Sequence, residues 1–180
     1  ASIHMASGNA QDALDDANVL LELAPGLALA KLRRAEANMM LTNWEAAKDD
    51  LELIIEDAPH HHHALTQLAA CYISMDRPEK AEAPLNEALR LAPDHTDAWH
   101  QRGLLYLDWG REEAALNDFE AAVRCDGSHL DARLHIAAIH HEAKRFVEAS
   151  GAWKGVLAIE PDHAVARRRK EECEMAIATM

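Results

Sequence analysis

Histidine is the residue type whose chemistry has to be considered first in this sequence, since twelve of its 180 residues are histidines. Four of them form an uninterrupted run from His60 to His63. A second group, His135, His140 and His141, includes a pair that one helix could present together. Neutral imidazole binds zinc and nickel, and its proton exchange near neutral pH can switch a surface charge. Two roles of the histidines therefore have to be tested against the sequence: a metal site and a pH-responsive surface.

The spacing of the histidines argues against a physiological metal site. Four of them recur at intervals of 34 residues: His61, His95, His129 and His163. Equivalent positions in stacked helix pairs lie about 10 Å apart, whereas the ligands of one zinc ion lie within about 4 Å of one another. The run at 60–63 is expected to capture nickel or zinc only adventitiously, and we predict no metal and no cofactor. A pH-responsive groove remains an alternative interpretation, and it would be formed by four histidines: His63, His100, His135 and His141.

The other reactive side chains do not form a catalytic pattern. No nucleophile is followed by a recognisable base, and no glycine-rich phosphate loop is present. The cysteines Cys71, Cys125 and Cys173 are far apart and are expected to be small apolar core residues. Carboxylates cluster along the second helix of a predicted pair, as in the segment 49–52, where we expect a solvated outer face. We do not expect an enzyme.

These side chains must be positioned by a repeating architecture, because helix breakers recur along the chain. Pro25, Pro59, Pro93 and Pro161 are 34, 34 and 68 residues apart, and Gly127 takes the missing place. A fixed period of this length is the signature of a repeat protein.

Small residues recur in the same register more strictly than the prolines. With each proline set third from the end of its unit, the third position is always alanine: Ala30, Ala64, Ala98, Ala132 and Ala166. The twentieth is also always alanine: Ala13, Ala47, Ala81, Ala115 and Ala149. The eighth is small: Ala1, Ala35, Ala69, Gly103 and Ala137. Helices that cross tightly need a small side chain where their backbones approach, so each unit is predicted to be an antiparallel helix pair.

Proline also predicts a local irregularity. Pro78 suits the first turn of a second helix, where its missing N–H costs nothing. Pro84 follows six residues later, inside the same helix, where an interior proline costs about 3 kcal/mol. We predict a kink or an irregular helix start there.

This pattern resembles the tetratricopeptide repeat family over nearly the whole chain. The fullest copy carries the family's residues in order: Ala98, Trp99, Gly103, Tyr106, Gly110, Ala115, Phe119 and Ala122. Lys31, Leu65 and Arg133 replace the tryptophan in the other units. The resemblance implies an all-α, right-handed solenoid of antiparallel helix pairs. We predict a single array over residues 1–180, made of a partial unit at 1–27, full units at 28–61, 62–95, 96–129 and 130–163, and a capping helix at 164–180. A start partway through a unit is compatible with a fragment of a longer protein.

The resemblance further implies a peptide groove on the first helices, lined by the second, fifth, sixth, ninth, twelfth and thirteenth positions of each unit. The groove candidates at these positions are Arg33, Glu36, Met40, His63, Gln67, Asp97, His100, Gln101, Leu104, Asp131 and His135. Some family members hold a chaperone's C-terminal carboxylate with lysine, arginine and asparagine in this groove. The equivalent residues here are Leu32, Glu36, Gln67, Asp97 and Gln101, or, one unit later, Thr66, Ala70, Gln101, Asp131 and His135. Neither set can clamp a carboxylate, so we do not expect a chaperone-tail ligand.

Net charge narrows the class of partner. The chain carries 31 acidic and 18 basic residues, a formal net charge of −13, which repels nucleic acid and favours a basic partner. No stretch approaches the roughly 20 apolar residues of a membrane span, and no signal peptide is evident. We expect a cytoplasmic protein–protein interaction scaffold that binds a partner peptide or helix; a membrane-tethered or secretory parent protein stays open. The alternative is a homo-oligomer assembled through the ends of the solenoid.

Overall fold

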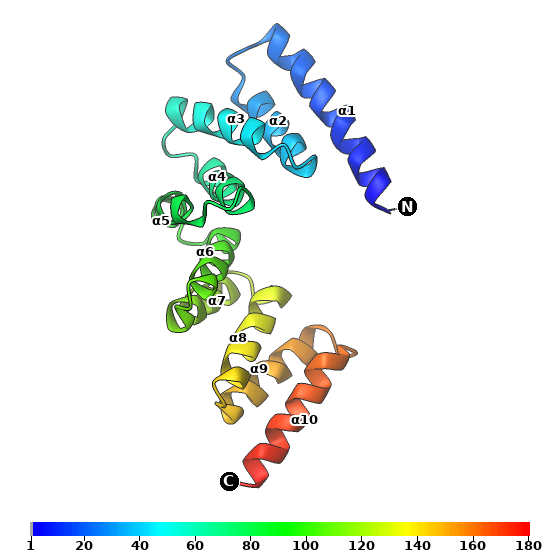
Figure 1. Cartoon of the computed structure of the whole chain (residues 1–180), viewed down its shortest axis with the longest axis vertical. Helices are drawn as coiled ribbons and strands as arrows, with labels where there is room; N and C mark the ends of the chain where they lie inside the picture. Colours follow the sequence, from blue (N-terminus) through cyan, green and yellow to red (C-terminus); the bar gives the residue numbers. More distant parts are fainter. Residues whose placement is uncertain (1) are drawn as a thin grey trace. The chain divides into compact units, whose positions relative to one another are not determined.

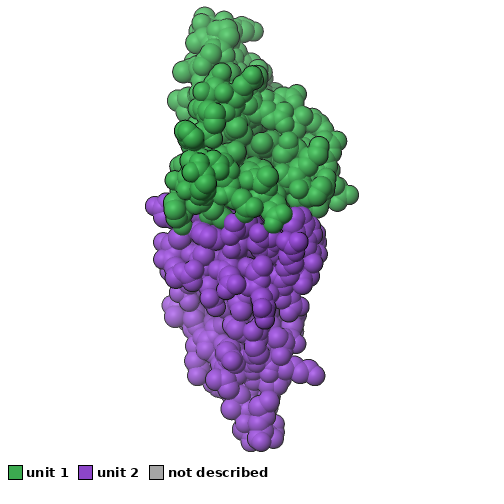
Figure 2. Space-filling model, turned by 90° about the vertical axis from the view of Figure 1, so that its left-hand side faces the viewer, with its two compact units in different colours: residues 1–93 green, residues 94–180 purple. Residues whose placement is uncertain are grey.

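The computed structural model describes residues 2–180, with side chains from residue 9 onward. Within this range the chain forms ten α-helices, one 3-10 turn and no strands (Figure 1). The helices belong to two compact units, residues 1–93 and residues 94–180 (Figure 2). The predicted all-α fold of antiparallel helix pairs is confirmed.

In each unit, helices that follow one another in sequence pack side by side. Unit 1 contains α1 (Ser2–Leu23), α2 (Ala28–Met40), α3 (Trp44–Asp57), α4 (His62–Ser74), η1 (Pro78–Lys80) and α5 (Glu82–Leu91). Unit 2 contains α6 (Thr96–Asp108), α7 (Glu112–Cys125), α8 (Leu130–Glu142), α9 (Phe146–Ile159) and α10 (Ala164–Ala178). We call α2, α4, α6, α8 and α10 the first helices of their repeats, and α3, α5, α7 and α9 the second helices.

The alanines of the register lie where the helices approach one another. All five residues at the third position are buried, as are Ala47, Ala81, Ala115 and Ala149 at the twentieth. Ala13, at the twentieth position in α1, is exposed instead. The main packing partner of α1 is α2, and Ala13 lies on a side of α1 that remains accessible to solvent. Ala1, at the eighth position, lies outside the described residues.

Gly103 shows how closely a helix pair can pack. A methyl group at this position would lie 2.7 Å from Cε1 of Phe119, a ring that is completely buried between the helices. Glycine is therefore required at the eighth position of this unit, because the Phe119 ring occupies the space that a methyl group would need.

The prediction for Pro84 is confirmed as an irregular helix start. Pro78 begins the 3-10 turn η1, and the α-helix starts only at Glu82. Pro84 is then the third residue of α5, within the first turn, where its missing N–H would have had no intrahelical acceptor. The chain thus avoids the cost of an interior proline by shortening the helix.

Two predictions are wrong, the solvated position of Asp50 and the core position of Cys125. Asp50 is only 3% exposed, although we expected it on a solvated outer face, because Arg34 donates two hydrogen bonds to it, of 2.8 and 2.7 Å. Asp118 is buried in the same way against Arg102, at 2.7 and 2.8 Å. Cys125 is exposed near the end of α7, whereas Cys71 and Cys173 are core residues as predicted.

Candidate functional site

The predicted groove residues divide between the two units, and all of them lie on first helices. In unit 1 they are Arg33, Glu36 and Met40 of α2 and His63 and Gln67 of α4. In unit 2 they are Asp97, His100, Gln101 and Leu104 of α6 and Asp131 and His135 of α8. We call the sides of these helices that carry the groove positions the α2–α4 surface and the α6–α8–α10 surface.

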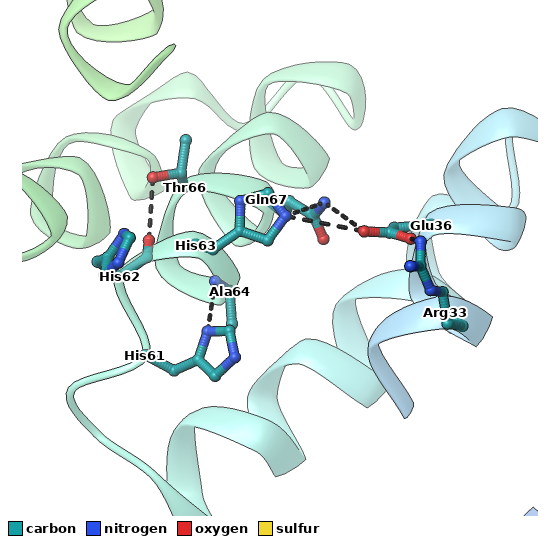
Figure 3. A network of polar contacts seen from close by, with 8 residues as sticks. All are labelled: Arg33, Glu36, His61, His62, His63, Ala64, Thr66 and Gln67. Atoms are coloured by element: carbon teal, nitrogen blue, oxygen red, sulfur yellow. Dashed lines mark hydrogen bonds and ion pairs between the residues drawn. The ribbon is translucent and has the colours of Figure 1, made fainter. Parts of the chain in front are cut away.

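On the α2–α4 surface, four of the predicted residues form one polar network (Figure 3). Arg33 Nη1 donates to Glu36 Oε2 at 2.9 Å. The other oxygen of Glu36 accepts from Gln67 Nε2 at 3.5 Å and lies 3.7 Å from His63 Nε2. Gln67 Nε2 and His63 Nε2 are 3.0 Å apart. Glu36 therefore joins two successive first helices and holds the network in place.

Large apolar side chains lie at the ends of this network. Leu29 and Met40, at the two ends of α2, are 58% and 60% exposed, and Ile73 near the end of α4 is also exposed. Leu29, Arg33, Glu36 and Met40 follow the i, i+4, i+7, i+11 spacing of one helix face. The α2–α4 surface thus has a fixed polar centre and solvated apolar ends.

On the α6–α8–α10 surface, two predicted residues serve mainly as packing groups. The ring of His135 stacks on Phe119, with ring centroids 4.7 Å apart, and the ring of His100 lies 5.7 Å from both. Burial lowers the pKa of His100 to about 4, with smaller contributions from His129 and His135. Burial also lowers the pKa of His135. These rings are half-buried and favour the neutral form, so they contribute little positive charge to the surface.

The carboxylates of the same surface remain accessible. Asp97 and Asp131 are exposed in the first turns of α6 and α8, and Asp108 and Glu142 are exposed at the last residues of these helices. None of the four makes an ion pair within the part of the chain that the structure describes. Gln101 is half-buried, and Leu104 is 36% exposed between the acidic ends. A cationic partner would therefore meet unneutralised charge here.

The histidines that recur every 34 residues have a structural role that the sequence analysis missed. The Nδ1 atoms of His61, His129 and His163 accept hydrogen bonds from the backbone N–H groups of Ala64, Ala132 and Ala166, at 3.1, 3.2 and 3.2 Å. They cap the N-termini of α4, α8 and α10, and His95 makes no such bond at α6. Among the described residues, no three metal-ligating side chains gather at one point.

A small pocket opens between α8 and α10. Its volume is about 190 Å³, and it is lined by Ala138, His141, Glu142, Trp153, Val165 and Arg169. Val165 and Arg169 occupy the second and sixth positions of α10, so the groove rule could have identified them. Trp153 comes from the second helix α9, behind the surface, and no rule about first helices would find it.

Polar contacts fix the rim of this pocket. Nε2 of His141 is 3.2 Å from Arg169 Nη1, and Nδ1 of His141 is 3.2 Å from Cys173 Sγ. Because a guanidinium can only donate, Nε2 accepts and Nδ1 carries the proton toward the sulfur. Arg169 also donates to Glu172 at 3.1 Å. Burial raises the pKa of the Cys173 thiol, which makes it an inert partner rather than a nucleophile.

Comparisons with known proteins agree with this geometry. Two family models, both described as tetratricopeptide repeat, match residues 29–61 and residues 68–134, which together make up more than half of the chain. None of the curated protein sequences matches the chain significantly. In the part of the chain that the structure describes, no helix has the length and apolar character needed to cross a membrane.

Several solved structures share the fold. MamA is 20% identical with a TM-score of 0.76, and the match covers 87% of this chain and 92% of that one. TTC0263, a thermophilic TPR protein of Thermus thermophilus, is 20% identical with a TM-score of 0.72, covering 93% and 92%. YrrB, described as a TPR protein with an unusual peptide-binding site, is 22% identical with a TM-score of 0.70, covering 91% and 84%. At these identities the likeness extends to the fold alone.

Proposed function

We propose that this chain, which belongs to the tetratricopeptide repeat family, binds a segment of a partner protein on the exposed sides of its first helices. Members of this family typically act as non-enzymatic scaffolds for protein or peptide partners. The α2–α4 surface carries this proposal. Its polar network is flanked by the exposed side chains of Leu29, Met40 and Ile73. Exposed apolar side chains around fixed polar groups are typical of a recognition surface.

The network supports binding because its polar groups are already ordered. Glu36 is held by Arg33 and by Gln67 of the next first helix. A partner therefore meets polar side chains that already contact one another, which reduces the entropic cost of ordering them on association. YrrB, which shares the fold, is described as having a peptide-binding site, and we propose an extended or helical segment as the ligand here as well.

The partner is proposed to be basic. The chain has a formal net charge of −13, and Asp97 and Asp131 are exposed on the α6–α8–α10 surface without an ion pair among the described residues. Complementary charge would accelerate encounter and select the partner more than it would add affinity. We place this interaction in the cytoplasm as part of the same proposal.

Charge reversal tests the proposal once a partner has been captured by affinity purification from the native cells. In the doubly substituted variant Asp97→Lys, Asp131→Lys, affinity measured by calorimetry should fall about tenfold or more, and the loss should shrink at high salt. The matched control is Glu113→Lys, an exposed first-turn carboxylate on the second helix α7. Unchanged affinity in the double variant would remove the basic partner from the proposal, and unchanged affinity in Glu36→Ala would remove the α2–α4 surface.

Self-assembly through the ends of the array is the alternative, and α10 argues against it. The first helices α2, α4, α6 and α8 have a small residue at the eighth position, where a second helix packs. In α10 this position is Glu171, which is exposed, and the adjacent Lys170 and Glu174 form an ion pair of 3.4 Å. A second copy would have to bury these charges, although α1 offers exposed Val19 and Leu23. Light scattering at several concentrations should give a constant monomer mass, and a mass that rises with concentration would restore the alternative.

A further inference from the structure

The pocket between α8 and α10 has an apolar interior behind a polar rim. Trp153 is 4% exposed and belongs to a core cluster with Ala137, Ala166 and Cys173, so its ring is a rigid surface. Val165 is 51% exposed although it is a large apolar residue. Together with Ala138, these side chains line a volume of about 190 Å³, which suits one amino-acid side chain.

One carboxylate of the pocket lining, Glu142, offers a place for a cation beside the pocket. Arg169 pairs with Glu172 at 3.1 Å, and Arg168 approaches the same carboxylate at 3.4 Å, so both arginines are turned toward Glu172. Glu142 lines the same pocket and is exposed, and it makes no ion pair in the described part of the chain. Glu142 is therefore the carboxylate of the pocket lining that is free to pair with a partner cation, on the side where α8 ends.

We propose that this pocket holds a single large apolar side chain of the partner segment, such as leucine, methionine or phenylalanine, and that a lysine or arginine next to it in the partner pairs with Glu142. The inference rests on the proposed function and specifies the chemistry of the partner. Burying the anchor against Trp153 removes apolar surface from water, and the paired cation fixes which residue enters. His141 and Arg169 are already held by Cys173 and Glu172, so the rim needs no rearrangement.

The probe for this site is a phage-displayed library of random twelve-residue peptides, selected on the full chain. Selected peptides should share an apolar residue beside a lysine or arginine. A synthetic peptide of the consensus should bind the Ala138→Leu variant, in which the pocket is filled, about tenfold or more weakly than the wild type. Ala114→Leu is the control, since Ala114 is also a half-buried alanine but lies on the second helix α7, away from the groove positions. Glu142→Lys should weaken binding by a similar factor, with Glu148→Lys on α9 as its control.

A double-mutant cycle keeps the test independent of folding effects. Replacing the peptide's anchor residue with alanine should weaken binding to the wild type but hardly change binding to Ala138→Leu, because the pocket is already closed in that variant. If the two changes are additive, or if Ala138→Leu binds as well as the wild type, the pocket proposal is overturned and the proposed function stands. If the wild type selects no peptide at all, both are overturned.

Discussion

At the scale of single residues, the fold depends on matched pairs at the eighth and twenty-fourth positions of each unit. The large residue at the twenty-fourth position is Leu51, Leu85, Phe119 or Trp153 in successive units, and all four are buried. The eighth position is alanine except for Gly103, which lies opposite the phenylalanine. The position of the Phe119 ring therefore leaves room only for glycine at position 103, whereas Ala137 is accommodated opposite Trp153.

The variant Gly103→Ala tests this matching. A new Cβ would lie 2.7 Å from the Phe119 ring, and overpacking of a core of this kind costs about 1 to 3 kcal/mol of unfolding free energy. The helix preference for alanine offsets up to about 1 kcal/mol of that cost. In the double variant Gly103→Ala, Phe119→Leu, which restores the pairing of the first two units, the cost should be clearly smaller than the sum of the single changes. Urea denaturation measures all three variants, and additive effects would contradict the matching.

At the scale of helix pairs, a buried ion pair alternates along the chain. The seventh and twenty-third positions hold Arg34 with Asp50 and Arg102 with Asp118. In the other two units the same positions hold Leu68 with Pro84 and Ile136 with Ala152. Arg102 also lies over the rings of Trp99 and Tyr106, 4.9 and 5.6 Å from their centroids. The same helix crossing is thus stabilised in two chemically different ways.

This alternation predicts that removing one partner of the ion pair destabilises the fold more than replacing both partners with apolar residues. Asp118→Ala removes the buried carboxylate that pairs with the half-buried Arg102, and breaking a fully buried pair costs about 3 to 5 kcal/mol, which is the upper bound here. Arg102→Ile together with Asp118→Ala introduces the pair found in the unit 130–163, and should cost much less than Asp118→Ala alone. Thermal unfolding followed by circular dichroism compares the two variants. A double variant less stable than the single one would show that the apolar solution does not transfer between units.

The helix pairs also show what the sequence could predict. Buried Ala64 and Ala98 were predictable because they depend only on periodicity along one chain, and the placement of Glu36 and Gln67 on first helices followed from the same register. The burial of Asp118 was not, because an outer-face rule takes no account of an arginine that crosses from the preceding helix. For the same reason the joining of Glu36 to Gln67 and the position of Trp153 under the α8–α10 pocket could be seen only in three dimensions.

At the scale of the whole molecule, the two units are expected to differ in their response to acid. His100, His135 and His140 all belong to unit 2, and burial is the main cause of the lowered pKa of each. Around His100 the neighbouring His129 and His135 lower the pKa further, and Asp97 and Asp131 oppose this effect. The unfolded chain therefore takes up protons at these rings more readily than the folded one, so acid favours unfolding of unit 2.

The sign of this effect sets the pH window. The stability contributed by the neutral rings is complete above the ordinary histidine pKa of 6.5 and declines as the pH falls toward the value of about 4 for His100. Urea midpoints should therefore fall between about pH 7.5 and about pH 5, and hydrogen-exchange protection should be lost first in residues 94–180. His100→Asn removes one of the titrating rings and should flatten this dependence, whereas His60→Asn on the exposed turn of unit 1 should not. Equal loss of protection in the two units would show that the buried rings of unit 2 do not govern the acid response.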